Sequence, residues 1–108
     1  MNAHDEITLG KICRYASQTI EFVKGMDLPT FSKDAKTVSA CVFNLSQIGE
    51  LAYKLSDEFV SKSTIPWHKI RGLRNRIVHD YEGIQLNIIW DVIESYLPTL
   101  VSSINEVR

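Results

Sequence analysis

Apolar side chains recur three and four positions apart along most of the chain, the spacing typical of amphipathic helices. The first such segment covers residues 5–24, where Asp5 or Thr8 is placed to cap the start and Gly25 to end the helix. No segment of the sequence shows the sustained alternation of apolar and polar positions that a strand requires. The pattern therefore predicts an all-α chain.

The second predicted helix is the longest, covering residues 32–60 with Ser32 or Asp34 as its cap. Its apolar positions follow a coiled-coil-like 4-3-4-3-4 spacing at Cys41, Leu45, Ile48, Ala52, Leu55 and Phe59. Gly49 lies in the middle, where it lowers helix propensity by about 1 kcal/mol relative to alanine. We interpret this glycine as a point where two helices approach closely, and not as a break.

A third helix follows a short linker, with Thr64 as a candidate N-cap and Pro66 near its first turn. It is predicted to end near His79 or Tyr81, where Glu82 and Gly83 stop it.

A last helix is predicted by apolar positions from Leu86 to Ile104. Pro98 must kink or divide it, because proline removes one intrahelical hydrogen bond and clashes with the preceding turn. The predicted architecture is an antiparallel four-helix bundle.

Composition limits the class of protein. A chain of 108 residues with 44% hydrophobic residues suits one globular domain. Its apolar runs are too short to span a membrane, and its N-terminus lacks the apolar core of a signal peptide, so we expect a cytoplasmic protein. Cys13 and Cys41 lie among apolar helical positions outside any CxxC or zinc pattern, and we expect them to be free buried thiols.

Charge is distributed unevenly along a chain whose net charge is −1. Residues 59–79 carry five basic and no acidic side chains, whereas the rest of the chain carries seven basic and all thirteen acidic ones. A positive surface on an acidic body can concentrate an anionic ligand at one place. The third helix is therefore the candidate working surface.

At about 100° per residue, this helix divides into distinct faces. One face is apolar and should pack on the bundle: Ile70, Leu73 and Ile77. The opposite face is polar: His68, Arg71, Asn75 and His79. Arg74 lies between the two faces.

Arginine and histidine together suit cleavage of RNA, whose 2′-hydroxyl supplies its own nucleophile. Histidine exchanges protons near neutral pH, and arginine offers a permanently charged fork to phosphate oxygens. Arg74 and His79 diverge by about 140° on an ideal helix, so the helix end must unwind or a second copy must complete the site. On its own, an arginine–histidine pair at this spacing is also typical of a helix surface that only faces solvent. Tyr81 could likewise be an aromatic residue that packs in the bundle with its hydroxyl at the rim.

The surrounding pattern resembles the HEPN superfamily, and within it the HepT-like toxins. The signature there is arginine, four variable residues, histidine, one residue and tyrosine, which Arg74, His79 and Tyr81 match without a gap. Asn75 matches the polar residue that commonly follows the arginine. Further matches extend the similarity over essentially the whole chain: the segment Asn44–Ser56 around Ile48-Gly49-Glu50, then Ile65-Pro66-Trp67, Ile89-Trp90 and Leu97-Pro98.

The resemblance implies a single HEPN-like domain over residues 1–108 that forms a homodimer with the motif helices lining a cleft. It implies a metal-independent endoribonuclease without a cofactor, in which Arg74 and His79 are catalytic and Asn75 supports them. The basic motif helix would then bind RNA through His68, Lys69, Arg71 and Arg76.

The resemblance further implies a nucleotidyltransferase antitoxin able to transfer AMP to Tyr81. This chain lacks a nucleotidyltransferase motif, so such a partner must be encoded separately. The alternative is a non-catalytic HEPN module that binds a nucleotide or a nucleotidyltransferase partner.

Overall fold

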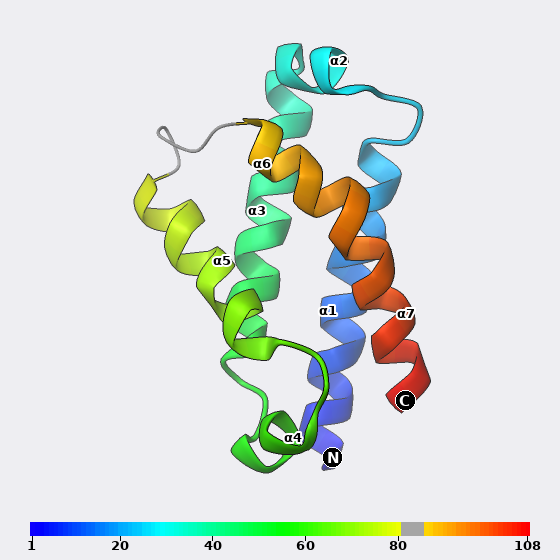
Figure 1. Cartoon of the computed structure of the whole chain (residues 1–108), viewed down its shortest axis with the longest axis vertical. Coiled ribbons are helices and arrows are strands. Elements are labelled where there is room, and N and C mark those ends of the chain that lie inside the picture. The colour runs from blue at the N-terminus through cyan, green and yellow to red at the C-terminus, as the bar shows by residue number, and fades with distance from the viewer. Residues whose placement is uncertain (81–85) are drawn as a thin grey trace.

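The computed structural model describes the backbone of residues 1–80 and 86–108, and their side chains except those of residues 78–80. Within this part, the regular structure is helical and contains no strand (Figure 1). The elements are α1 (Ala3–Phe22), α2 (Leu28–Lys33), α3 (Ala35–Ala52), α4 (Asp57–Lys62), α5 (Trp67–Asp80), α6 (Leu86–Asp91), the π-helix η1 (Val92–Tyr96) and α7 (Leu97–Val107). The predicted all-α bundle is confirmed.

Three helices form the body of the bundle, in which α1 packs against both α3 and α7. Their apolar stripes supply fully buried core residues such as Leu9, Ile12, Ile48, Leu97 and Ile104. The fourth long helix, α5, packs on α3, and Figure 1 shows it on the side of α3 that faces away from α1 and α7. Because one neighbour provides most of its packing, α5 keeps a large part of its circumference accessible.

The predicted helix over residues 32–60 is wrong, since this stretch contains parts of three helices. Asp34 ends α2 and caps α3 by accepting from the Thr37 backbone N–H, which confirms one of the two predicted caps. Ser56 begins α4, where its hydroxyl accepts from the Phe59 N–H. The apolar spacing continues across both breaks, so periodicity alone does not reveal them.

The break before α4 is fixed from the other end of the sequence by Asp5. This buried carboxylate accepts from the Ser56 N–H at 2.8 Å and from the Ser56 hydroxyl at 2.6 Å. Burial raises the pKa of Asp5, but hydrogen bonds from Ser56 and Asn2 outweigh it and leave the pKa below its ordinary value. The Asp5 carboxylate therefore holds the start of α4 against α1.

Two other predicted helix starts are also wrong. Asn2 caps α1 in a reciprocal capping box with Asp5, so neither Asp5 nor Thr8 is the cap. The third helix begins at Trp67, directly after Pro66, and Thr64 lies too far upstream to cap it. Gly25 follows the end of α1 with φ of 81°, the left-handed conformation that favours glycine after a helix.

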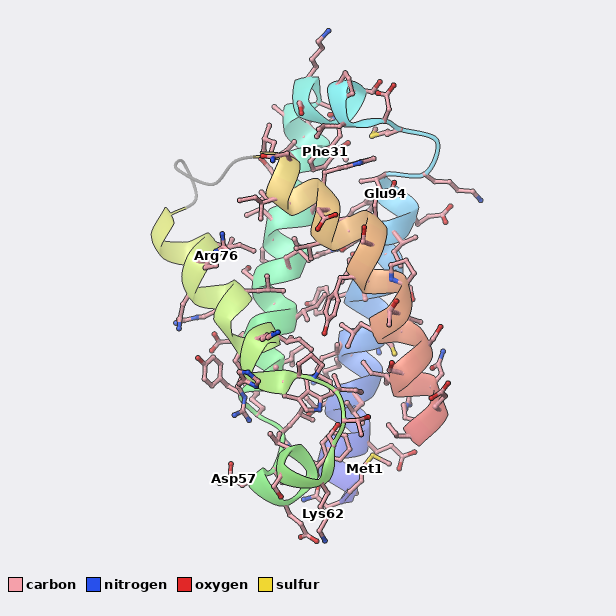
Figure 2. The ribbon with its side chains drawn as sticks, viewed as in Figure 1. Met1, Phe31, Asp57, Lys62, Arg76 and Glu94 are labelled. Carbon is pink, nitrogen blue, oxygen red and sulfur yellow. The ribbon has the colours of Figure 1, made fainter. Side chains whose placement is uncertain are left out.

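The predicted division of the last helix near Pro98 is confirmed. The Leu97 N–H bonds to the Val92 carbonyl, which is the wider spacing of a π-helix, and Pro98 follows in the first turn of α7. Proline has no N–H and its ring crowds the preceding turn, so the wide turn accommodates it. Phe31 of α2, labelled in Figure 2, packs against Trp90 of α6 with ring centroids 5.1 Å apart and ring planes tilted by 43°.

Both cysteines are free thiols, as predicted, with Cys41 buried and Cys13 only partly buried. Burial raises the pKa of the Cys41 thiol to about 11. Among the helices of residues 1–80 and 86–108, none combines the length and apolar character needed to cross a membrane.

Candidate functional site

Helix α5 divides as its sequence predicts. Ile70 and Ile77 are buried on the bundle and Leu73 is half-buried. The polar residues form two groups, which we name by the element each one faces. The α3 flank consists of Arg71, Arg74 and Asn75, which contact α3 or its C-terminal turn, and the η1 flank consists of Lys69, Gly72 and Arg76, which line a groove beside η1.

Gly49 of α3 lies directly beneath Arg74. A Cβ atom at position 49 would lie 2.6 Å from the Arg74 Cβ and 2.7 Å from the Arg74 backbone nitrogen, distances that no side chain can accept. The predicted close approach of two helices at Gly49 is therefore confirmed. The residue that α3 approaches so closely at Gly49 is the arginine of the motif.

Glu50, the next residue of α3, holds the charged end of the same arginine. Its Oε2 lies 2.8 Å from the Arg74 Nε, and the two side chains are 47% and 39% exposed. An ion pair this accessible to water contributes little to the free energy of unfolding. Its larger effect is to fix where the guanidinium lies and to offset its charge.

Asn75 links this arginine to a tyrosine. Its Oδ1 accepts from Arg74 Nη1 at 3.2 Å, and its Nδ2 donates to the Tyr53 hydroxyl at 3.5 Å. The supporting role predicted for Asn75 is thus compatible with its contacts. The amide connects Arg74 to the turn that ends α3.

Arg71 closes the α3 flank. Its Nε donates to the Ala52 carbonyl at 3.0 Å, and its guanidinium lies 5.3 Å from the centre of the Tyr53 ring. A cation at this place satisfies a carbonyl of the last helical turn and complements the helix dipole. Arg71, predicted to contact RNA, is thus used at least in part to fasten α5 to α3.

The remaining basic candidates are more exposed. His68, Lys69 and Arg76 all have exposed side chains, and Figure 2 shows Arg76 on α5. None of the three forms an ion pair with another residue of the described part. The residues predicted to bind RNA therefore fall into one fastened arginine and three accessible groups.

His79 lies within α5, which continues to Asp80. The helix therefore continues through position 79, which lies about 140° around the axis of an ideal helix from position 74. The side chain of His79 lies outside the described residues, as does the whole of Tyr81 and the predicted stop at Glu82 and Gly83. Within one chain, positions 74 and 79 do not share one face of α5.

Two contributors were not predicted from the sequence as site residues. Glu50 and Tyr53 both contact the motif residues of α5, but from a different helix and its terminal turn. The sequence signal for both was the segment Asn44–Ser56, which formed part of the family pattern. Among the described residues, no three His, Cys, Asp or Glu side chains gather as a metal site would require.

On the basic helix of this bundle, Arg74 is held by Glu50 and lies beside Asn75. Such an arrangement is typical of a domain that binds a phosphate-containing ligand. Comparison with known families makes this specific, because the profile described as "Ribonuclease HepT-like" matches residues 12–107. The chain belongs to this HepT-like ribonuclease family of the HEPN superfamily.

Individual relatives agree. A protein of Caldanaerobacter subterraneus subsp. tengcongensis named "Putative RNase" is 38% identical over 89 residues, covering 82% of this chain and 80% of that protein. A Methanocaldococcus jannaschii protein of the same name is 35% identical, covering 82% of this chain and 74% of that protein. "Probable ribonuclease HepT" of Thermococcus cleftensis is 26% identical, covering 82% and 81%. No solved structure matches the chain.

Proposed function

We propose that this chain is a metal-independent endoribonuclease and the toxin of a toxin–antitoxin pair. The observation that carries the proposal is the arrangement around Arg74. Gly49 brings its backbone against α3, Glu50 fixes its guanidinium, and Asn75 lies beside it. An arginine held in this way at an accessible surface offers a preset hydrogen-bonding fork to a phosphate group.

The proposed chemistry uses the 2′-hydroxyl of the RNA. A base removes the 2′ proton while the 2′ oxygen attacks the adjacent phosphorus, and the bond from phosphorus to the 5′ oxygen breaks. An acid returns a proton to that leaving oxygen, which yields a 2′,3′-cyclic phosphate and a free 5′-hydroxyl. His79 is the group suited to the proton transfers, while Arg74 offsets the charge that develops on the phosphate.

A homodimer completes the proposed site. Positions 74 and 79 lie about 140° apart around the axis of a continuous α5, so they do not share one face of the helix. Two copies of α5 facing each other across a two-fold axis would bring His79 of one chain toward Arg74 of the other, because a two-fold interface pairs each patch with its own copy. We therefore propose the dimer as the active unit.

The proposed partner is a separately encoded nucleotidyltransferase antitoxin that attaches AMP to Tyr81. Its phosphodiester would add bulk and negative charge two residues after His79. That charge would occupy the basic surface and repel RNA. Replacing Tyr81 with phenylalanine should therefore prevent neutralisation unless the antitoxin forms a stable complex.

The decisive experiment incubates purified wild type and His79→Ala with RNA in the presence of a chelator. We expect the wild type to cleave and His79→Ala to lose cleavage while keeping its circular dichroism and dimer mass. His4→Ala is a matched control, because it removes an exposed histidine from α1. Cleavage at the wild-type rate by His79→Ala contradicts the catalytic assignment. Intact RNA with the wild type, together with binding by His79→Ala, identifies a non-catalytic binding module.

A further inference from the structure

A groove runs along the side of α5 that faces η1. Its volume is about 420 Å³, within the size range of small-molecule sites. It exists because α5 packs on α3, whereas within the described residues α5 and η1 make no comparably extensive contact. Lys69, Gly72 and Arg76 line it from α5, and Val92 and Tyr96 from η1.

The walls of the groove are apolar and its cations are accessible. Leu73, Val92 and Tyr96 are half-buried residues that also pack against the core. Lys69 and Arg76 are exposed, and no acidic side chain lines the groove among the described residues. An apolar and aromatic slot beside two exposed cations is complementary to a flat base that carries phosphates.

The spacing of the two cations favours an extended ligand. Lys69 and Arg76 are seven residues apart on a continuous helix, which places them about 10 Å apart along its axis. Cations this far apart do not converge on one phosphate. They suit two phosphates of a polyanion that lies along α5 on either side of the slot.

The wall contributed by η1 is itself unusual. Val92 and Tyr96 are the first and last residues of the π-helix, and both line the groove. Short π-helical segments within α-helices are rare and often occur at functional sites. Pro98 accounts for the presence of the wide turn. The turn in addition places Val92 and Tyr96 where they line the groove.

We infer that this groove binds one unpaired nucleotide of a single-stranded RNA, with the base against Leu73, Val92 and Tyr96 and the flanking phosphates at Lys69 and Arg76. The inference rests on the proposed function for the identity of the ligand and extends it to substrate selection. Since Arg74 belongs to the same helix, a nucleotide held on the η1 flank fixes which part of the strand reaches the α3 flank. Base-paired RNA cannot enter the slot, because its bases are stacked.

Gly72 allows a direct test by filling the groove. A Cβ added there meets no atom within 4 Å, so the position is open beside the groove, and we expect a leucine to extend into it. Leucine also has the higher helix propensity, so the folded state of Gly72→Leu should not weaken. Ser102→Leu is the matched control, since it adds the same side chain at an exposed position of α7.

The probe is a fluorescent single-stranded 2′-O-methyl oligonucleotide, which lacks the attacking hydroxyl and survives any nuclease of this type. We expect Gly72→Leu to bind it about tenfold more weakly than wild type or Ser102→Leu, with thermal unfolding unchanged or raised. Replacing both Lys69 and Arg76 with glutamine should lower the slope of log affinity against log salt by about 1.4, at 0.7 for each lost contact. A duplex of the same sequence should compete poorly with the single strand.

Other results overturn the inference. Equal binding of the oligonucleotide by Gly72→Leu and wild type would do so, as would the absence of any binding by wild type. A change in dimer mass in Gly72→Leu would instead identify the groove as an interface between copies of the chain. The two proposals fail separately. Wild type that binds through the groove but leaves RNA intact refutes only the nuclease, whereas Gly72→Leu that binds and cleaves normally refutes only the groove.

Discussion

The two flanks of α5 carry the same kinds of side chain and differ in what surrounds them. On the α3 flank, Arg71 and Arg74 each contact a partner on α3, namely the Ala52 carbonyl and the Glu50 carboxylate. On the η1 flank, Lys69 and Arg76 are exposed beside an open groove. A group that must meet a reacting phosphate gains from a fixed position, while a group that only attracts the strand gains from freedom. One helix thus supports two different uses of positive charge.

The largest expected effect is a difference in cleavage rate between two variants, each of which changes one arginine to lysine, one on the α3 flank and one on the η1 flank. Arg74→Lys keeps the charge but loses the planar fork that contacts Glu50 and Asn75, so we expect cleavage to fall by about 100-fold. Arg76→Lys should reduce cleavage by at most about threefold, because a cation without fixed geometry is sufficient there. Initial rates on one RNA, measured side by side, give the comparison. Equal losses in the two variants would show that the flanks do not differ in this way.

A second comparison uses the two glycines. Gly49→Ala places a methyl group 2.6 Å from Arg74 Cβ, and we expect a loss of about 1–3 kcal/mol in the free energy of unfolding, although alanine favours helix. Gly72→Ala meets no atom within 4 Å and should stabilise by about 0.5–1 kcal/mol. Urea unfolding measures both. Two variants that change stability in the same direction would contradict the close contact at Gly49.

The smallest expected effects concern Glu50. Replacing it should change RNA affinity and the cleavage rate constant in opposite directions. Glu50→Gln removes a partly exposed ion pair worth about 0.2–1 kcal/mol, so the stability should hardly change. Binding of a non-cleavable strand should tighten by up to about fivefold, because a negative charge beside Arg74 is gone. The rate constant for cleavage of bound RNA should fall, because the guanidinium loses its fixed position. A carboxylate with a purely structural role would leave both quantities unchanged.

Much of this comparison was accessible from the sequence because it follows helical periodicity. The buried face of α5, the close approach at Gly49 and the division near Pro98 all depend on local spacing or on one residue's covalent structure. The family pattern also indicated the family, which the profile match over residues 12–107 confirms.

The parts that sequence reasoning missed depend on contacts between distant segments. The turn before α4 is held by Asp5, which lies 51 positions from Ser56, so the local apolar spacing runs across it. The pairing of Glu50 with Arg74 depends on how two helices cross, and the groove depends on the space left between α5 and η1. No periodicity encodes these distances. The reach of the His79 side chain stays a prediction.

The contact between Gly49 and Arg74 also limits how this chain can change over many generations. A substitution at position 49 enlarges a residue that has no role in chemistry, yet it moves the backbone that carries the motif arginine. We therefore expect a larger residue at position 49 only together with compensating substitutions in α3 or α5, or in chains that no longer need the arginine. Lineages that have lost the glycine are where we expect inactive, binding-only descendants.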